Sequence, residues 1–160
     1  AEEAPLVIFA DNAGPDFLLG VVPAAVYWSH RRLVRIVVNS EPASSDITYP
    51  EAGDLLATLA SETDGAVART LESGRLHLVP SGTGAPGIDL RHVGSELNQA
   101  ARGAAWVLID GQGRGVETNW TTRFACPVLR ICVIKDPLVA AEIDAHEGRP
   151  LLRWDEASAR

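Results

Sequence analysis

Several residue types and patterns are scarce in this sequence of 160 residues, and each scarcity excludes a class of protein. The two cysteines, Cys126 and Cys132, have no CxxC or Cys/His spacing, which excludes a disulfide framework. No apolar run reaches the roughly 18 residues of a membrane span. Basic residues are outnumbered by acidic ones, 14 to 21, and the net charge of −7 argues against nucleic acid as a partner.

What is present indicates one globular unit. Hydrophobic residues make up 46% of the chain, enough to bury a core without disulfides. The start, Ala1-Glu2-Glu3, lacks the basic residues of a signal peptide. We therefore expect a single soluble, cytoplasmic domain over residues 1–160, with no membrane partner. Lysine is the rarest basic residue, because Lys135 is the one lysine among 14 basic side chains.

Apolar runs rich in Val and Ile recur along the chain, and most are continuous rather than alternating. Such runs are typical of strands buried on both faces of a parallel sheet. We predict strands over residues 6–10, 34–38, 76–79, 105–109 and 129–134, and an edge strand over 151–154. Helical spacing predicts helices over residues 16–30, 50–62, 64–73, 93–102 and 137–145.

The alternation of these elements predicts an α/β fold, a three-layer, doubly wound Rossmann-like domain with a mostly parallel sheet of five to six strands. In such sheets ligands bind outside the carboxyl ends of the strands. Oxygen ligands, amides, glycines and cations follow the predicted strands at these ends: Asp11, Asn12, Asn39, Ser40, Asp46, Asp110, Gly111, Gly113, Arg114 and Lys135. A divalent cation prefers carboxylate and amide oxygens, and a phosphoryl group prefers backbone N–H groups with Lys or Arg.

Each of these residues also has a plainer interpretation. Asp, Asn and Gly after a strand are common turn residues, and Asp46 could be an ordinary loop acid. Lys135 ends an apolar strand, where a charged residue has either a structural ion pair or a function. The sequence has no GxSxG elbow and no zinc spacing among its histidines. A dinucleotide-binding oxidoreductase domain would rest on the fold alone.

Five motifs together resemble the damage-control phosphatase family, once called domain of unknown function 89, and most of all the phosphatase domain at the C-terminus of pantothenate kinase 4. They lie at residues 11–16, 39–48, 84–90, 110–119 and 133–136. The resemblance implies a metal-dependent phosphomonoester hydrolase that acts on small phosphorylated metabolites, 4'-phosphopantetheine and its damaged forms in that subgroup. The cofactor would be a divalent ion, Mg, Mn, Co or Ni.

The same resemblance implies roles for individual residues. The metal ligands would be Asp11, Asn12 and Asp46, and the catalytic residues Asp11 and Lys135. Substrate-binding residues would be Asn39, Ser40, Asp110, Gly111, Gly113, Arg114 and Lys135. Either a water molecule or Asp11 itself would attack phosphorus.

Some positions depart from the family pattern. Asp136 stands beside Lys135 where an Asn is usual, and the family's N-terminal helical region is absent from these residues. We therefore keep a second hypothesis, a non-catalytic module that binds metal or a phosphometabolite, or serves as a scaffold. Under either hypothesis, the expected partners are a small phosphorylated metabolite and a homo-oligomer or partner chain that supplies the missing helical region.

Overall fold

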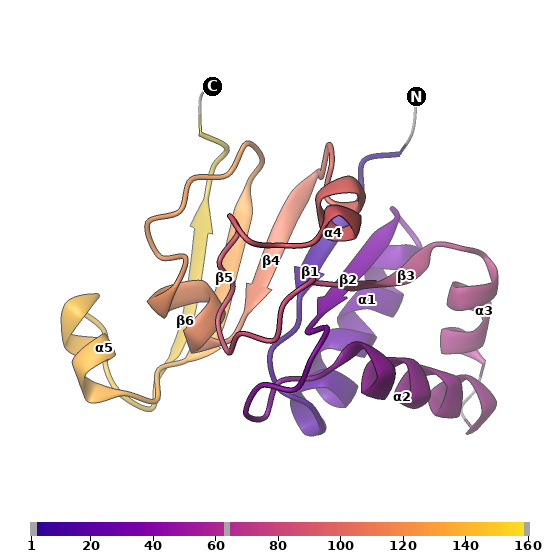
Figure 1. Cartoon of the computed structure of the whole chain (residues 1–160), viewed down its shortest axis with the longest axis horizontal. Coiled ribbons are helices and arrows are strands. Elements are labelled where there is room, and N and C mark those ends of the chain that lie inside the picture. Colours follow the sequence, from indigo (N-terminus) through magenta and orange to yellow (C-terminus); the bar gives the residue numbers. More distant parts are fainter. Residues whose placement is uncertain (1–2, 63–64, 159–160) are drawn as a thin grey trace.

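The structure, a computed structural model, describes residues 3–62 and 65–158 and is built around one six-stranded sheet. The strand order is β3-β2-β1-β4-β5-β6 (Figure 1). The strands are β1 (Leu6–Phe9), β2 (Val34–Val38), β3 (Leu76–Pro80), β4 (Trp106–Asp110), β5 (Val128–Val133) and β6 (Pro150–Asp155). Strands β1 to β5 are parallel to one another, and β6 runs antiparallel to β5. The predicted α/β fold with a mostly parallel sheet is confirmed.

Helical segments lie between the strands, as predicted. They are η1 (Asp16–Val21), α1 (Val22–Ser29), α2 (Tyr49–Glu62), α3 (Ala66–Glu72), α4 (Ser95–Ala100), η2 (Gly113–Glu117) and α5 (Pro137–Glu142), where η marks a π-helix. In the part of the chain described, no helix is long and apolar enough to cross a bilayer.

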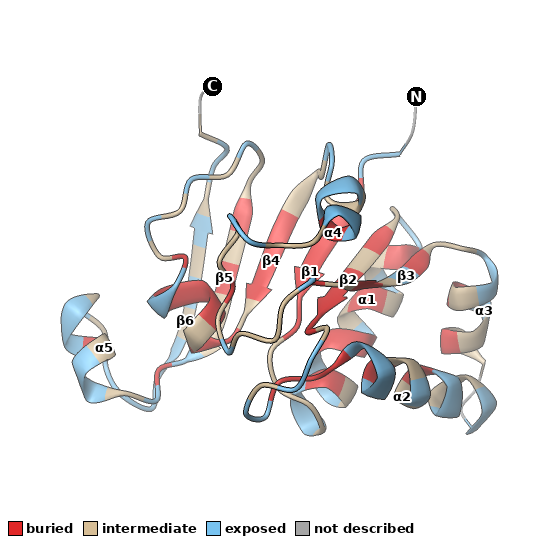
Figure 2. Cartoon of the chain, in the orientation of Figure 1, coloured by how far each residue is buried: buried red, intermediate tan, exposed pale blue. Residues whose placement is uncertain are grey.

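The two faces of the sheet carry separate apolar cores, because successive side chains of a strand point to opposite faces. On one face, Leu6, Ile8 and Ile36 pack with the helices from η1 to α3. On the other, Val7 and Phe9 pack with α4 and the segment that precedes it. Burial is concentrated in the central strands, whereas β6 and α5 are largely exposed (Figure 2). A continuous apolar strand such as β1, buried at every position, follows from this two-sided covering.

The predicted elements differ from the observed ones mainly at their ends. The helix predicted over 16–30 is π-helical over Asp16–Val21 and α-helical over Val22–Ser29. The change occurs just before Pro23, which has no N–H to donate to the preceding turn. Residue 64 of the helix predicted over 64–73 lies outside the described residues, and α3 covers Ala66–Glu72. The segment Gly113–Glu117 forms η2, although its glycines predicted a turn.

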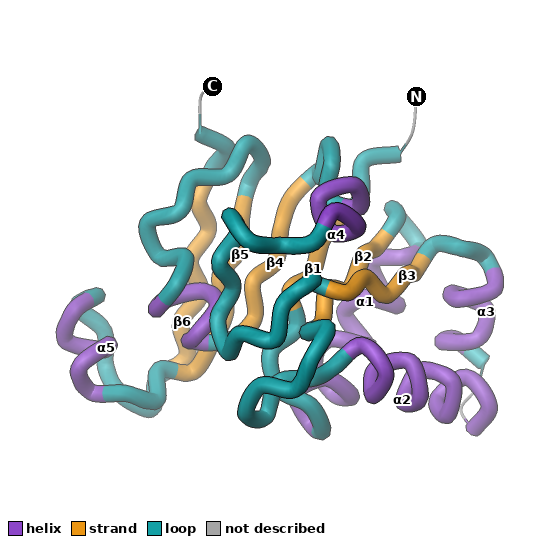
Figure 3. The backbone as a smooth tube through the Cα atoms, in the orientation of Figure 1, coloured by secondary structure: helices purple, strands orange, loops and turns teal. Residues whose placement is uncertain are grey.

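A long loop over residues 81–94 connects β3 to α4 and runs across one face of the sheet (Figure 3). Ile88 of this loop is buried in the core of that face. Ile88 therefore anchors the loop on this face, and the Asn39 side-chain amide donates to the Ala85 carbonyl of the loop at 3.2 Å.

Candidate active site

Four parallel strands bring polar residues to one edge of the sheet. Asp11 and Asn12 follow β1, Asn39 follows β2, Asp110 ends β4 and Lys135 follows β5. Strands β1 and β4 are neighbours in the sheet although β2 and β3 separate them in the sequence. A crevice forms outside the carboxyl ends where the strand order reverses in this way, and the candidate site lies there.

The segment after β2 folds back onto the end of β1 and brings Asp46 to the site. The Ile47 amide donates to the Asp11 carbonyl at 2.9 Å, and the Asn39 amide donates to the Ile47 carbonyl at 3.0 Å. Asn12 and Asp46 form an isolated antiparallel bridge. The side chain of Ile47 is fully buried in the core, which anchors the segment. Asp46, the preceding residue, is thereby held beside Asp11.

Arg114 of η2 joins the residues from β1 and β2. Its side chain is 1% exposed, and its guanidinium forms ion pairs with Asp11 and, at 3.0 Å, with Asp46. It also donates to Oδ1 of Asn39 at 3.0 Å. The Asn39 side-chain amide donates in turn to Asp46 at 3.1 Å. Because a buried charge is costly unless it is paired, this network holds both carboxylates in fixed positions.

The carboxylates of the site outnumber its cations. Asp11, Asp16, Asp46 and Asp110 face Arg114 and Lys135, which leaves two negative charges uncompensated. Burial raises the pKa of Asp11; Arg114 opposes this rise and the neighbouring Asp46 adds to it. Burial, followed by repulsion from Asp11 and Asp16, raises the pKa of Asp110 to about 6. The site is therefore one that a cation would stabilise.

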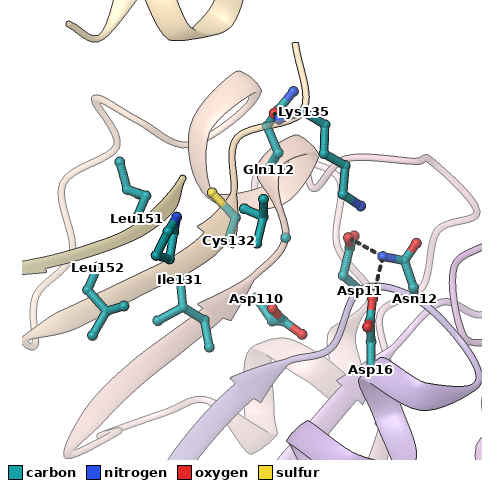
Figure 4. Close-up of a pocket in the computed structure, with 13 residues that line it drawn as sticks. Asp11, Asn12, Asp16, Asp110, Gln112, Ile131, Cys132, Lys135, Leu151 and Leu152 are labelled. Carbon is teal, nitrogen blue, oxygen red and sulfur yellow. Dashed lines mark hydrogen bonds between the residues drawn. The ribbon is translucent and has the colours of Figure 1, made fainter. Parts of the chain in front are cut away.

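A pocket of about 410 Å³ opens beside this cluster (Figure 4). One half of its wall is charged or polar and contains Asp11, Asn12, Asp16, Asp110, Gln112 and Lys135. The other half is mainly apolar and comes from β5 and β6, with Ile131, Cys132, Val133, Pro150, Leu151 and Leu152. Among the described residues that line the pocket, Lys135 is the only cation.

The backbone after β5 is fixed by the segment after β4. The Lys135 amide donates to Oε1 of Gln112 at 2.6 Å, and the Gln112 side-chain amide donates to Glu117 at 2.8 Å. Lys135 itself is exposed, and its side chain extends toward Asp11 (Figure 4). Asp136, the neighbouring acid, accepts from the amides of Leu138 and Val139 and caps α5. Its charge therefore serves the start of a helix.

Some of the residues predicted from the sequence line the pocket, and the others lie behind its wall. Asp11, Asn12, Asp110, Gly111 and Lys135 line the pocket. The Gly111 amide already donates to the Ile131 carbonyl at 2.9 Å, so this amide is engaged within the sheet edge.

The other predicted residues lie behind the pocket wall. Asn39 and Arg114 are buried beneath the carboxylates. The Ser40 hydroxyl accepts from the Gly82 amide at 2.8 Å and holds the segment after β3. Gly113 begins η2 and approaches the Pro86 carbonyl closely, since an added Cβ would lie 3.2 Å from it. Their roles toward a ligand stay predictions.

Sequence reasoning missed three residues of the site. Asp16 reaches the pocket and accepts from the Asn12 side-chain amide at 2.9 Å. The Ser45 hydroxyl donates to Oδ1 of Asn12 at 2.6 Å, and Gln112 lines the pocket. Asp16 could have been found from its place four residues after Asn12 at the start of a predicted helix. Cys132 lines the pocket too, and burial raises the pKa of its thiol to about 11.

The donor set fits a hard cation of the magnesium type. Within residues 3–62 and 65–158 no group of three or more His, Cys, Asp or Glu side chains is placed to hold a metal. Asp11, Asp46 and the amide oxygen of Asn12 are oxygen donors, with two carboxylates among them. Mg²⁺ is commonly bound by one or two carboxylates, with water and substrate phosphate completing its shell. The two uncompensated negative charges of the site match a divalent ion.

Comparisons with known proteins give one consistent result. The family model of the damage-control phosphatase ARMT1-like domain matches residues 1–151. A damage-control phosphatase of Arabidopsis thaliana is 35% identical over 140 residues, which cover 84% of this chain and 36% of the relative. Pantothenate kinase 2 of the same plant is 33% identical over 159 residues, covering 86% of this chain and 18% of that protein.

Two further similarities extend this result. The 4'-phosphopantetheine phosphatase of Mus musculus is 26% identical over 199 residues, covering 93% of this chain and 24% of that protein. A solved DUF89 family protein of Pyrococcus horikoshii superposes with a TM-score of 0.67 at 20% identity, over 92% of this chain and 46% of the other. That likeness shows the fold. The chain spans 18% to 36% of the length of these curated relatives.

Proposed function

Because the chain belongs to the damage-control phosphatase family, we propose that it is a divalent-metal-dependent phosphatase that hydrolyses a small phosphorylated metabolite. The observation that carries the proposal is that Asp11 and Asn12 line one pocket together with Lys135, while Asp46 is bridged to Asn12 directly behind them. We take 4'-phosphopantetheine as the first substrate to test, because one relative is named a phosphatase of that compound.

In this proposal Asp11, Asn12 and Asp46 hold the divalent ion. When bound, the ion acts as a Lewis acid that polarises the phosphoryl oxygens. Arg114 fixes the carboxylates of Asp11 and Asp46 from their buried side. The Ser45 hydroxyl donates to Oδ1 of Asn12, which fixes the orientation of the Asn12 side-chain amide. The chain therefore provides an ordered set of oxygen donors before a ligand arrives.

Lys135 supplies positive charge to the phosphate. A phosphate monoester carries close to two negative charges at neutral pH, and the acidic pocket would otherwise repel it. The flexible side chain of Lys135 extends toward Asp11 (Figure 4). The tight bond between its backbone amide and Gln112 holds the base of this side chain. An exposed ammonium with a fixed base can follow the phosphoryl oxygens as charge develops on them.

The contacts of Asp11 favour a water molecule as the nucleophile. One carboxylate oxygen pairs with Arg114 and the other accepts from the Asn12 side-chain amide at 3.0 Å. Both oxygens therefore have donors that fix the carboxylate in place, and in this proposal their remaining lone pairs bind the divalent ion. In the proposed mechanism Asp11 would hold the divalent ion, and a water molecule would be the nucleophile.

A second candidate function is a binding or scaffold module without turnover. The observation that favours it is Arg114, which already places a cation between Asp11 and Asp46. Such a chain would bind a phosphometabolite without hydrolysing it.

Phosphate release distinguishes the two functions. We expect release from p-nitrophenyl phosphate and 4'-phosphopantetheine in the presence of Mg²⁺, Mn²⁺, Co²⁺ or Ni²⁺. Substituting Lys135→Gln should lower kcat/KM about 100-fold, the usual effect of removing one group that stabilises transition-state charge. The matched control is Arg123→Gln, which removes an exposed cation outside the pocket. Binding of phosphate esters with no release under any metal would favour the module instead.

A further inference from the structure

The pocket continues onto an apolar part of the sheet that the catalytic residues leave unused. In the strand registers, Asp110 is paired with Ile131 and Ile131 with Leu152, so these side chains form one row across β4, β5 and β6. The next row on the same face is Leu108, Leu129 and Trp154. Side chains two residues apart on a strand share a face, so both rows lie on the side that carries η1 and α1. The acidic end of the first row is Asp110, in the candidate active site.

A second cavity follows these rows. Its volume is about 220 Å³, and it lies between the sheet and the helical segment η1–α1. It shares Asp16, Asp110 and Ile131 with the pocket already described, so the two form a continuous groove. Its remaining lining is apolar or glycine and includes Ile8, Val21 and Leu108. The groove thus leads from the phosphate end of the site onto the open sheet face.

The edge strand β6, beside this groove, carries large apolar side chains that are unusually exposed. Leu152, which lines the first pocket, is 75% exposed. Trp154 lies next to it on the same face of β6, outside the linings of both cavities, and is 49% exposed. Contiguous exposed apolar surface commonly marks a binding groove or an interface. Because this surface is continuous with the candidate active site, the ligand that best suits it is the part of the substrate that is attached to the phosphate.

The charges of the groove restrict what that remainder can be. Asp16 and Asp110 stand where the groove leaves the pocket, and Lys135 is the one cation among the described lining residues of both cavities. Lys135 is needed for the phosphate itself. A second anionic group on the substrate would therefore face carboxylates with no cation to receive it.

We propose that this groove, between η1 and β6, is the subsite for the alcohol part of the substrate, and that Leu152 is a specificity-determining residue in it. The substrate class is a phosphate monoester of an extended, uncharged and largely apolar alcohol. Compact polyhydroxylated phosphates and substrates with a second anionic group fit this groove poorly. The inference rests on the proposed function, because it takes the phosphate to lie between Lys135 and the carboxylate cluster.

Binding of straight-chain alkyl phosphonates tests the subsite without turnover, since their carbon–phosphorus bond resists hydrolysis. Dissociation constants are measured by titration calorimetry for phosphonates of two, four, six and eight carbons, with Mg²⁺ at pH 8. We expect affinity to rise about twofold to fourfold for each added methylene that enters the groove, as expected for partial to full apolar burial. An ω-carboxylate on the six-carbon chain should weaken binding about fivefold through repulsion by the two acids.

The variant Leu152→Ser should remove most of the gain with chain length. Leu138→Ser is the matched control, because Leu138 is 80% exposed on α5 and lines neither cavity. Both leucines are on the surface, so either variant should fold. A dependence on chain length that is the same in the two variants would overturn the proposal, as would affinity that does not change with length.

The outcome for the proposed function is separate. Length-independent binding together with phosphate release from p-nitrophenyl phosphate would reject the subsite and keep the phosphatase. Length-dependent binding that is lost in Leu152→Ser, without release of phosphate, would keep the subsite and reject the phosphatase. No binding of any phosphonate and no release would reject both.

Discussion

Substitution of Gly111 by alanine should damage the chain for two separable reasons. Gly111 follows β4 with a φ of +97°, a conformation that L-residues adopt at a cost of about 1–3 kcal/mol. An added Cβ would also lie 2.2 Å from Cγ of Asp11 and 2.3 Å from its Oδ2. Asp11 cannot simply move aside, because it is paired with the buried Arg114. Overpacking of this kind costs about 1–3 kcal/mol more.

Gly103→Ala is the control for the backbone contribution. Gly103 has a φ of +68°, and a Cβ added there would meet nothing within 4 Å. Both variants lose the flexibility of glycine in the unfolded chain, so this effect cancels between them. Urea unfolding followed by tryptophan fluorescence should show Gly111→Ala about 2–6 kcal/mol less stable than the parent chain, and about 1–3 kcal/mol less stable than the control. Equal losses in the two variants would refute the close packing of Gly111 on Asp11.

Three further perturbations probe the same region. Arg114→Met leaves Asp11 and Asp46 buried without their cation, and urea unfolding should show that the free energy of unfolding falls by about 3–5 kcal/mol. A decrease under about 1 kcal/mol would contradict the pairing. Asp110→Asn should stabilise the metal-free chain above pH 6, because the raised pKa makes ionisation of Asp110 costly in the folded state. The gain in thermal midpoint should shrink as the pH falls through 6 and vanish below about pH 4. A gain that does not depend on pH would be evidence against the raised pKa of Asp110. Asp136→Ala removes the cap of α5 and should cost about 1 kcal/mol in the same unfolding assay, whereas a loss of phosphatase activity with unchanged stability would place Asp136 in the site instead.

The strands could be predicted because their sequences leave few alternatives. Continuous Val, Ile and Leu runs of four to six residues are too short for a buried helix in a chain with frequent glycines and polar turns. The run at Leu6–Phe9 is buried throughout, as its composition predicts. The edge strand Pro150–Asp155 alternates instead, with Leu152 and Trp154 on one face and Arg153 on the other.

The candidate site could be predicted only in outline. Parallel strands bring their carboxyl ends to one edge, so Asp11, Asp110 and Lys135 were expected to lie together, and they line one pocket. The position of Arg114 could not be predicted, because its burial depends on a π-helical turn and on a segment far away in the sequence that carries Asp46. A glycine-rich run after a strand predicts a loop, and local preferences do not show where its arginine points.

The position of an acid next to a candidate site residue in the sequence was also a poor guide to its role. Asp136 adjoins Lys135 in the sequence, yet its carboxylate accepts two amide hydrogens at the start of α5. Asp16, five residues after Asp11, reaches the pocket instead. An acidic side chain near the start of a helix can cap that helix instead of entering a site, and the sequence alone does not show which acid does so.

The most direct measurement is phosphate release from p-nitrophenyl phosphate as a function of added divalent metal, compared between Asp46→Asn and Asp54→Asn. Both variants remove one carboxylate charge, but Asp46 is buried against Arg114, whereas Asp54 is exposed on α2. We expect metal-dependent release that a chelator abolishes, that Asp54→Asn retains and that Asp46→Asn loses. Release that persists in chelator, or that Asp46→Asn retains at the level of Asp54→Asn, would contradict it.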